Sequence, residues 1–115
     1  KLRTRVGGGV SRAGDAVSAS VISPESYLGA MMEGVVEQVS GNRVTVVFRS
    51  LSYRGTKVGI TSTTTDFVNS KGHKLVDDEE RPLRLAAGAF VGDGAQWVLD
   101  EGAEVRLVVN PGGGQ

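Results

Sequence analysis

Apolar and polar residues alternate one by one along several short segments of this chain. The alternation is clearest in residues 16–22, 43–49 and 103–109. Successive side chains of a β-strand point to opposite faces, whereas a helix repeats every 3.6 residues, so this period indicates strands. One apolar and one polar face per strand is typical of antiparallel sheets with one buried side. The pattern therefore restricts the chain to an all-β fold.

Turn-forming residues separate these segments. The chain holds 17 glycines, most of them between apolar runs, and Gly41, Gly55, Gly94 and Gly102 sit where hairpins would reverse. A single antiparallel small barrel or sandwich of seven to eight strands is expected, with at most one short helical turn within residues 23–32. The expected strands are 16–22, 31–39, 43–51, 57–63, 73–76, 96–99 and 103–109.

A chain of 115 residues is sufficient for one hydrophobic core. We expect residues 1–110 to form a single β domain, residues 111–115 to be a glycine-rich tail, and residues 7–9 to be a flexible loop. The core is expected to include Val17, Val21, Val36, Val44, Val46, Phe48, Ile60, Leu85, Val105 and Leu107.

The residue types that most enzymes need are scarce. The chain has no cysteine and one histidine, His73, which excludes thiolate nucleophiles and Cys- or His-cluster metal sites. The glycine-rich stretches lack the Lys-Ser/Thr ending of a phosphate-binding loop. Residues 77–80 are four consecutive acids, whereas calcium loops space their ligands at alternate positions, so a solvated acidic loop is favoured. We therefore expect no catalytic residues, no metal ligands, no cofactor and no enzymatic activity.

Three features suggest contact surfaces instead. Residues 60–65 are rich in β-branched hydroxyl side chains, which predicts an edge or surface strand suited to pairing with a neighbour's strand. Residues 1–57 hold eight basic and four acidic residues, and residues 58–115 hold five and nine, so a polarised domain could meet another copy. The single tryptophan is either a core plug or an interface anchor. The candidate interface residues are Thr61, Thr63, Thr64, Thr65, Trp97, Arg49, Arg54, Asp77, Asp78, Glu79 and Glu80.

Four segments carry a resemblance to a known group of proteins. Residues 10–21 contain a hydroxyl residue, then Gly14-Asp15, then an alternating strand with a central alanine; residues 34–36, 48–51 and 99–105 follow the same group's later motifs. The chain resembles uncharacterised bacterial cell-envelope β domains and, more remotely, β-barrel scaffolds of secretion and conjugation channels. The resemblance implies no catalytic residues and a periplasmic, cell-envelope or extracellular location. Such domains usually have a further glycine-containing strand before the position of Leu2, which predicts trimming or processing of the N-terminus.

These observations favour a non-catalytic structural or interaction module of a bacterial envelope or extracellular assembly. Its partner is expected to be a protein, either other copies of the chain or an envelope protein, bound through strand edges and complementary charge. The alternative is a β-barrel that binds a glycan or single-stranded nucleic acid. Aromatic residues make up 5% of the chain and the net charge is zero, so nucleic acid is not favoured. No transmembrane segment is expected, because no apolar run approaches the length needed to cross a bilayer.

Overall fold

The chain folds into antiparallel β-strands around one core. The computed structural model describes residues 1–8, 11–23, 25–76, 79, 81–86, 88–92 and 96–111. The all-β prediction is confirmed, with nine strands in the described residues and a single 3-10 turn, η1 (Glu25–Tyr27). The strands are β1 (Val6–Gly8), β2 (Ala16–Ser20), β3 (Met31–Ser40), β4 (Arg43–Tyr53), β5 (Thr56–Val68), β6 (Arg84–Ala86), β7 (Ala89–Val91), β8 (Trp97–Leu99) and β9 (Glu104–Pro111).

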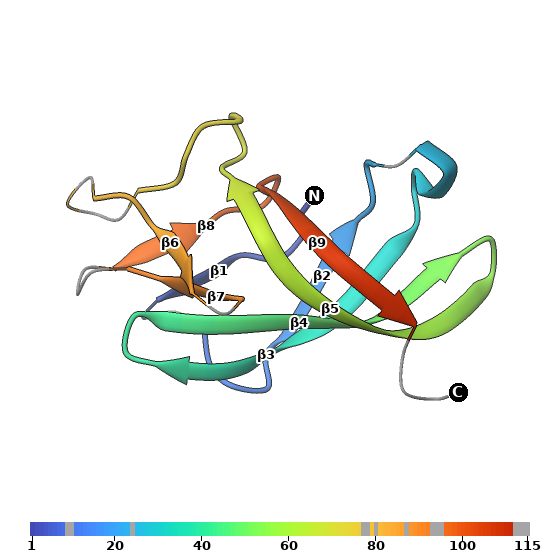
Figure 1. The fold of residues 1–115 in the computed structure, drawn as a ribbon, viewed down its shortest axis with the longest axis horizontal. Coiled ribbons are helices and arrows are strands. Elements are labelled where there is room, and N and C mark those ends of the chain that lie inside the picture. The colour runs from blue at the N-terminus through green and yellow to red at the C-terminus, as the bar shows by residue number, and fades with distance from the viewer. Residues whose placement is uncertain are drawn as a thin grey trace.

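One curled sheet forms most of the molecule. Its strand order is β2-β3-β4-β5-β9, β7 also pairs with β4, and β6 pairs with β7. The long strands β5 and β9 lie side by side and cross the β3–β4 hairpin diagonally (Figure 1). A separate pair, β1 with β8, lies at the other end of the molecule from the tip of the β4–β5 hairpin. The curl places the two ends of the strand order, β2 and β9, opposite one another.

The first residues of the chain join β2 to the beginning of β9. Leu2 forms a bridge with Ala19, and its N–H donates to the carbonyl oxygen of Ala103 at 2.7 Å. The N–H of Gly102 in turn donates to the carbonyl oxygen of Leu2 at 2.8 Å. The two edges of the curled sheet are therefore joined at the level of Leu2 by a single short segment.

The sheet branches along one edge of β4. The beginning of β4 pairs with β7, its end pairs with the beginning of β5, and both partners lie on the side away from β3. Between them the hydroxyl of Ser62 accepts a hydrogen bond from the N–H of Phe48 at 2.9 Å and donates one to the carbonyl oxygen of Phe48 at 3.1 Å. A serine side chain thus replaces the missing ladder partner, and β5 can bend away from β4 toward β9.

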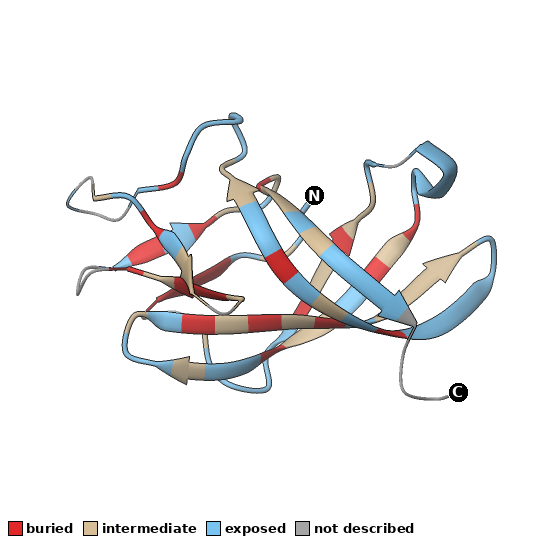
Figure 2. Cartoon of the chain, viewed as in Figure 1, coloured by how far each residue is buried: buried red, intermediate tan, exposed pale blue. Residues whose placement is uncertain are grey.

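The core follows the alternation of the sequence. Along β4 the inward residues Val44, Val46 and Phe48 are buried and their neighbours are more exposed (Figure 2). Of the predicted core residues, Val17, Val36, Val44, Val46, Phe48 and Ile60 are buried, and Val21, Leu85, Val105 and Leu107 are partly buried against them. The same residues that set the strand pattern therefore form the interior.

Two local predictions are wrong. Gly7 and Gly8 are part of the buried strand β1 and not of a flexible loop. Gly8 lies so close to the ring of Trp97 that a Cβ would approach its Nε1 to 2.7 Å, so glycine is needed there for packing. Residues 73–76 are not a strand, and only Val76 forms an isolated bridge, to Pro82. The predicted reversal at Gly94, the rest of the glycine loop at Gly9 and the tail residues 112–115 lie outside the described residues.

Candidate binding groove

The threonine-rich segment forms a ladder along one of its edges. Residues 60–68 of β5 pair with β9, whereas the ladder between β5 and β4 covers residues 56–59. On the side of β4 the segment is held by the hydroxyl of Ser62, which bonds the main chain of Phe48. The suggestion that this segment pairs with a neighbour's strand stays a prediction. Thr61, Thr63 and Thr65 are exposed on the outer face of the sheet. Thr64 is buried, with 4% of its surface exposed, and does not belong to a surface. The Oγ1 hydroxyl of Thr65 donates within the sheet, to the carbonyl oxygen of Arg106 at 3.3 Å.

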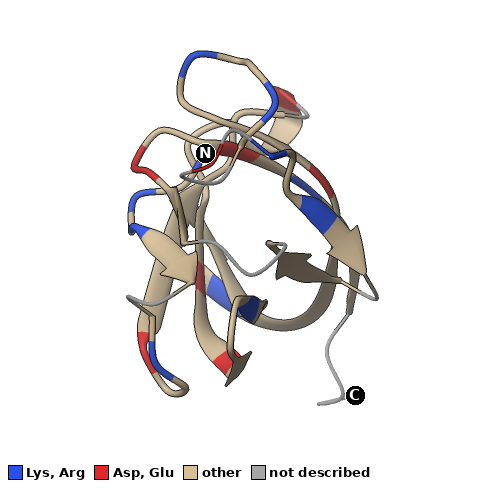
Figure 3. Cartoon of the chain, turned by 90° about the vertical axis from the view of Figure 1, so that its left-hand side faces the viewer, with Lys and Arg blue, Asp and Glu red and all other residues tan. Residues whose placement is uncertain are grey.

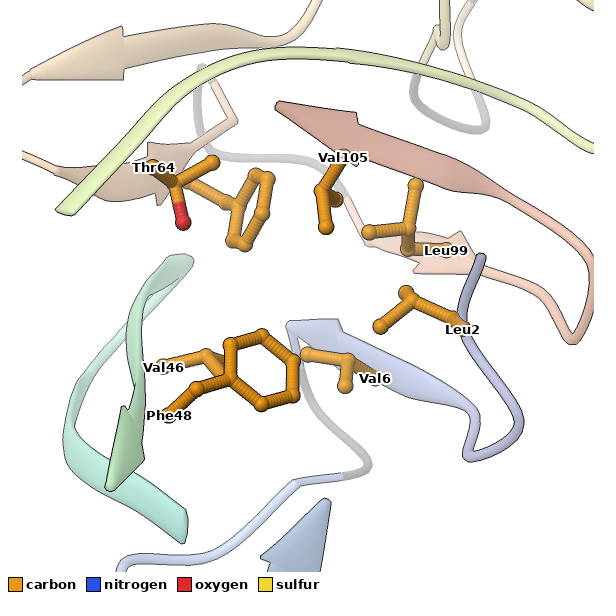
Figure 4. A pocket seen from close by; sticks show the side chains of 8 residues that line it. Leu2, Val6, Val46, Phe48, Thr64, Leu99 and Val105 are labelled. Atoms are coloured by element: carbon orange, nitrogen blue, oxygen red, sulfur yellow. The ribbon is translucent and has the colours of Figure 1, made fainter. Parts of the chain in front are cut away.

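The side chain of Thr64 points toward a small cavity in the core (Figure 4). The cavity volume is about 10 Å³, which leaves room for no more than one water molecule. Its walls are apolar apart from Thr64, and they consist of Leu2, Val6, Val46, Phe48, Phe90, Leu99 and Val105. This space belongs to the packing of the barrel and is too small for a ligand.

Trp97 is a core residue. Its exposed fraction is 2%, its Nε1–H donates to the carbonyl oxygen of Asn42 at 3.0 Å, and its ring centroid lies 5.9 Å from that of Phe90. A buried indole with its polar atom satisfied is a structural anchor. The prediction of a core plug is confirmed, and the alternative of an interface anchor is wrong.

The charged candidates occupy exposed positions among opposite charges. The Nη2 atom of Arg49 lies 3.7 Å from a carboxylate oxygen of Glu37, and the Nη2 atom of Arg81 lies 2.8 Å from one of Glu79. In the view along the barrel, basic and acidic segments lie next to one another around the ring (Figure 3). Basic and acidic residues are unevenly distributed along the sequence, but they are interleaved in space over the described chain. Asp77, Asp78 and Glu80 lie outside the described residues.

A wide groove opens where the barrel edges separate. Beyond Leu2 no strand joins β9 to the continuation of β2 within the described part of the chain, and a groove of about 810 Å³ lies between them. This size is typical of ligand-binding clefts. The residues that line it are Lys1, Ala19, Ser20, Val21, Ile22, Ser23, Tyr27, Met32, Leu51, Val58, Gly59, Ile60, Asp66, Phe67, Val68, Glu104, Val105, Arg106, Leu107, Val109 and Asn110.

The floor of the groove is the apolar interior of the barrel. Met32 and Ile60 are buried beneath it, and Leu51, Phe67 and Leu107 are half-buried on its sides. Its rim includes several exposed apolar side chains. The exposed fractions are 42% for Ile22, 44% for Tyr27, 47% for Val58 and 42% for Val109. Apolar side chains gathered around a concavity are typical of a binding surface.

One wall of the groove is an unpaired strand edge. Within the described residues β9 is the last strand of the order and forms a ladder with β5 alone. On the opposite wall Val21 directs its N–H and C=O toward β3, where they bond Ala30 and Gly29. Ile22, two residues beyond β2, lines the groove, and no main-chain hydrogen bond of this residue is found among the described residues. The strand edge that stays unpaired along the groove is therefore that of β9.

An aromatic and basic cluster stands at one end of the groove. The ring centroids of Tyr27 and Tyr53 are 5.3 Å apart, and the guanidinium carbon of Arg54 lies 5.0 Å from the centroid of Tyr53. Arg54 has a φ of 50°, the left-handed region that favours glycine and asparagine. The hairpin turn therefore places its one arginine over an aromatic ring at some conformational cost.

The other end of the groove carries the amino group of Lys1. This ammonium donates to the carbonyl oxygen of Ser20 at 2.7 Å, and the N–H of Ser20 donates to the carbonyl oxygen of Lys1 at 2.8 Å. Burial lowers the pKa of the Lys1 ammonium, and the nearby carboxylate of Glu104 opposes that change. The charges lining the groove are of both signs, since Asp66 and Arg106 also belong to it.

Within the described residues no three His, Cys, Asp or Glu side chains are placed to hold a metal ion. None of the described helical segments has the length and apolar character needed to cross a membrane.

The sequence pattern identified Val21, Ile60, Val105 and Leu107 as apolar core positions, and all four line the groove. It did not indicate that this part of the core is open, because that depends on which strand edges meet.

Neither the sequence nor the fold matches a known relative: no protein-family model, no curated protein and no solved structure is similar to this chain. The resemblance to cell-envelope domains stays a prediction.

Proposed function

We propose that the protein is a non-catalytic interaction module that binds an extended segment of another protein chain in the groove between β9 and β2. The observation that carries this proposal is the combination of an apolar floor with the unpaired strand edge of β9 along one wall. An added strand would satisfy the main-chain groups, and its alternate side chains would cover the floor.

The shape of the groove supports a strand over a compact ligand. Its apolar residues follow the length of β9, from Val105 through Leu107 to Val109, and do not converge on one polar anchor. Peptide recognition by strand addition takes its affinity from main-chain hydrogen bonds and its specificity from the pockets for alternate side chains. Placement of the module in an envelope or extracellular assembly, and binding of further copies of itself, stay predictions.

The test uses two neighbouring valines of β9 as a matched pair. Val109 lines the groove and Val108 does not, and both are well exposed, at 42% and 53%. The probe is a capped synthetic peptide of alternating threonine and valine with a lysine at each end, titrated into isotope-labelled protein and followed by amide chemical shifts. We expect shifts centred on β9 and Ile22. Val109→Lys should weaken binding at least about ten-fold because it puts a charge on the apolar wall, and Val108→Lys should leave it unchanged.

Equal effects of the two substitutions, or shifts away from β9, would contradict the proposal. A series of such peptides that varies the inward side chain guards against a poor choice of probe. The bound segment comes either from a different protein or from a second copy of this chain. Sedimentation of the free protein over a range of concentrations distinguishes these two sources. Dimers sensitive to Val109→Lys would identify a second copy as its donor.

A second candidate function rests on the Tyr27, Tyr53 and Arg54 cluster. Partly exposed rings beside a guanidinium can stack on the face of a sugar or a nucleobase. Single-stranded oligonucleotides and oligosaccharides are the probes for this site, and Tyr27→Ala is the variant, since Tyr27 is the more exposed of the two tyrosines. Loss of such binding in Tyr27→Ala, with Val109→Lys unaffected, would assign ligand binding to the cluster and not to the groove.

A further inference from the structure

The segment Lys1–Thr4 already behaves as a short strand between β2 and β9. It runs antiparallel to β2, with Leu2 opposite Ala19 and Lys1 opposite Ser20. On its other side Leu2 bonds Ala103 and Gly102 at the beginning of β9. This segment occupies the part of the gap that is closed, and the groove is the remainder of the same gap.

The direction of a strand that fills the groove follows from its walls. Neighbouring strands along the order from β2 to β9 are all antiparallel, so β2 and β9 point the same way around the barrel. A strand antiparallel to both walls runs in the same direction as Lys1–Thr4. Its C-terminal end then lies at Lys1, and its N-terminal end lies near Asn110 and the β4–β5 hairpin.

The burial of the first residues indicates which positions of that strand point inward, which we call its phase. Leu2 points inward with 3% of its surface exposed, whereas Lys1 and Arg3 are exposed. Side chains of a strand alternate between faces, so the position immediately before Lys1 points inward, opposite the partly buried Val21. Lys1 and Ser20 form a hydrogen-bonded pair, and bonded and non-bonded pairs alternate, so the next position points outward and lies opposite Ile22.

We propose that the groove accepts a strand of about six residues that is collinear with Lys1–Thr4, antiparallel to β9, and apolar at the first, third and fifth positions counted back from Lys1. The inward side chains cover Met32, Leu51 and Leu107. This inference rests on the proposed function and adds the direction and register of the bound segment, which define the partner as a short strand with apolar residues at alternate positions.

Two extensions of identical composition test the register. One places Thr-Val-Thr-Val-Thr-Val directly before Lys1, which puts the valines at the inward positions. The other places Val-Thr-Val-Thr-Val-Thr there, which puts the valines outward, since a slip of one residue exchanges the two faces. A Gly-Ser extension of equal length gives the baseline. Each protein is compared for its melting temperature and for the exchange rates of its amide hydrogens.

The in-phase extension, Thr-Val-Thr-Val-Thr-Val with its valines inward, is expected to raise the melting temperature by about 5–10 °C over both other proteins. It should also slow amide exchange at Ile22 and along β9 at least about ten-fold, and it should abolish binding of the alternating peptide. Equal melting temperatures for the two valine extensions would overturn the inference, as would a higher one for the out-of-phase extension.

The outcome separates the register from the function. If the in-phase extension is stabilising but the unextended protein binds no alternating peptide, the register stands and the proposed function fails. If peptides bind at β9 but the two extensions behave alike, the function stands and the assigned direction and phase are wrong.

Discussion

Ser62 holds the point where the sheet branches between β4, β5 and β7. Its hydroxyl accepts from the N–H of Phe48 and donates to the carbonyl oxygen of the same residue, at 2.9 and 3.1 Å. Both groups lie where β4 has no ladder partner, between its pairings with β7 and β5. Ser62→Ala removes both bonds at once and leaves the two main-chain groups of a buried residue without a protein partner.

The expected loss follows from this geometry. Each unsatisfied group at a buried site costs about 1–3 kcal/mol, and the partly buried position of Ser62 lets water reach the groups and reduce that cost. We expect Ser62→Ala to lower the free energy of unfolding by about 2 kcal/mol. With an unfolding entropy of about 2.1 cal/mol/K per residue, that corresponds to a fall of about 8 °C in melting temperature for this chain.

The assay is urea unfolding followed by circular dichroism, with Thr63→Ala as the control. Thr63 is the next residue on β5, is exposed, and loses only a β-branched surface side chain. Ser62→Thr keeps the hydroxyl and should recover most of the stability. If Ser62→Ala and Thr63→Ala lose the same small amount, the hydroxyl does not substitute for a ladder partner and the account of the branch is wrong.

Three further predictions concern other parts of the barrel. Gly34→Ala should lower the free energy of unfolding, measured in urea, by about 2–3 kcal/mol, because a Cβ there would overlap the carbonyl oxygen of Val47 across a β-bulge. A loss below about 0.5 kcal/mol would refute the close approach. Trp97→Phe should lower the free energy of unfolding, measured by thermal melting, by about 2 kcal/mol, because the Asn42 carbonyl loses its donor and the core loses volume. An unchanged melting temperature would contradict this. The pKa of the Lys1 ammonium is lowered from 8.0 by burial, so between that lowered value and 8.0 the unfolded chain binds more protons and stability should rise with pH. Acetylation of this amino group should remove that rise, and a rise that persists would assign it to another group.

Much of the fold was predictable because local pattern and burial agree. Val44, Val46 and Phe48 alternate in the sequence and all point into the core. The short strand β1 was not predictable, since its glycines signal a loop unless the ring of Trp97 is known to lie against them. For the candidate site the sequence indicated a surface without catalytic groups, but it selected the threonine segment and not the groove beside β9.

The sequence by itself determined that the chain forms short antiparallel strands with one apolar face, because side-chain alternation acts residue by residue and needs no distant partner. Only the tertiary structure decided which strand edges are satisfied. Whether an edge is free depends on residues far apart in the chain, such as Leu2 joining Ala19 to Ala103 and Ser62 capping Phe48. The groove beside β9 is the place where such long-range pairing stops, so its position follows from the closure of the barrel and not from any local motif.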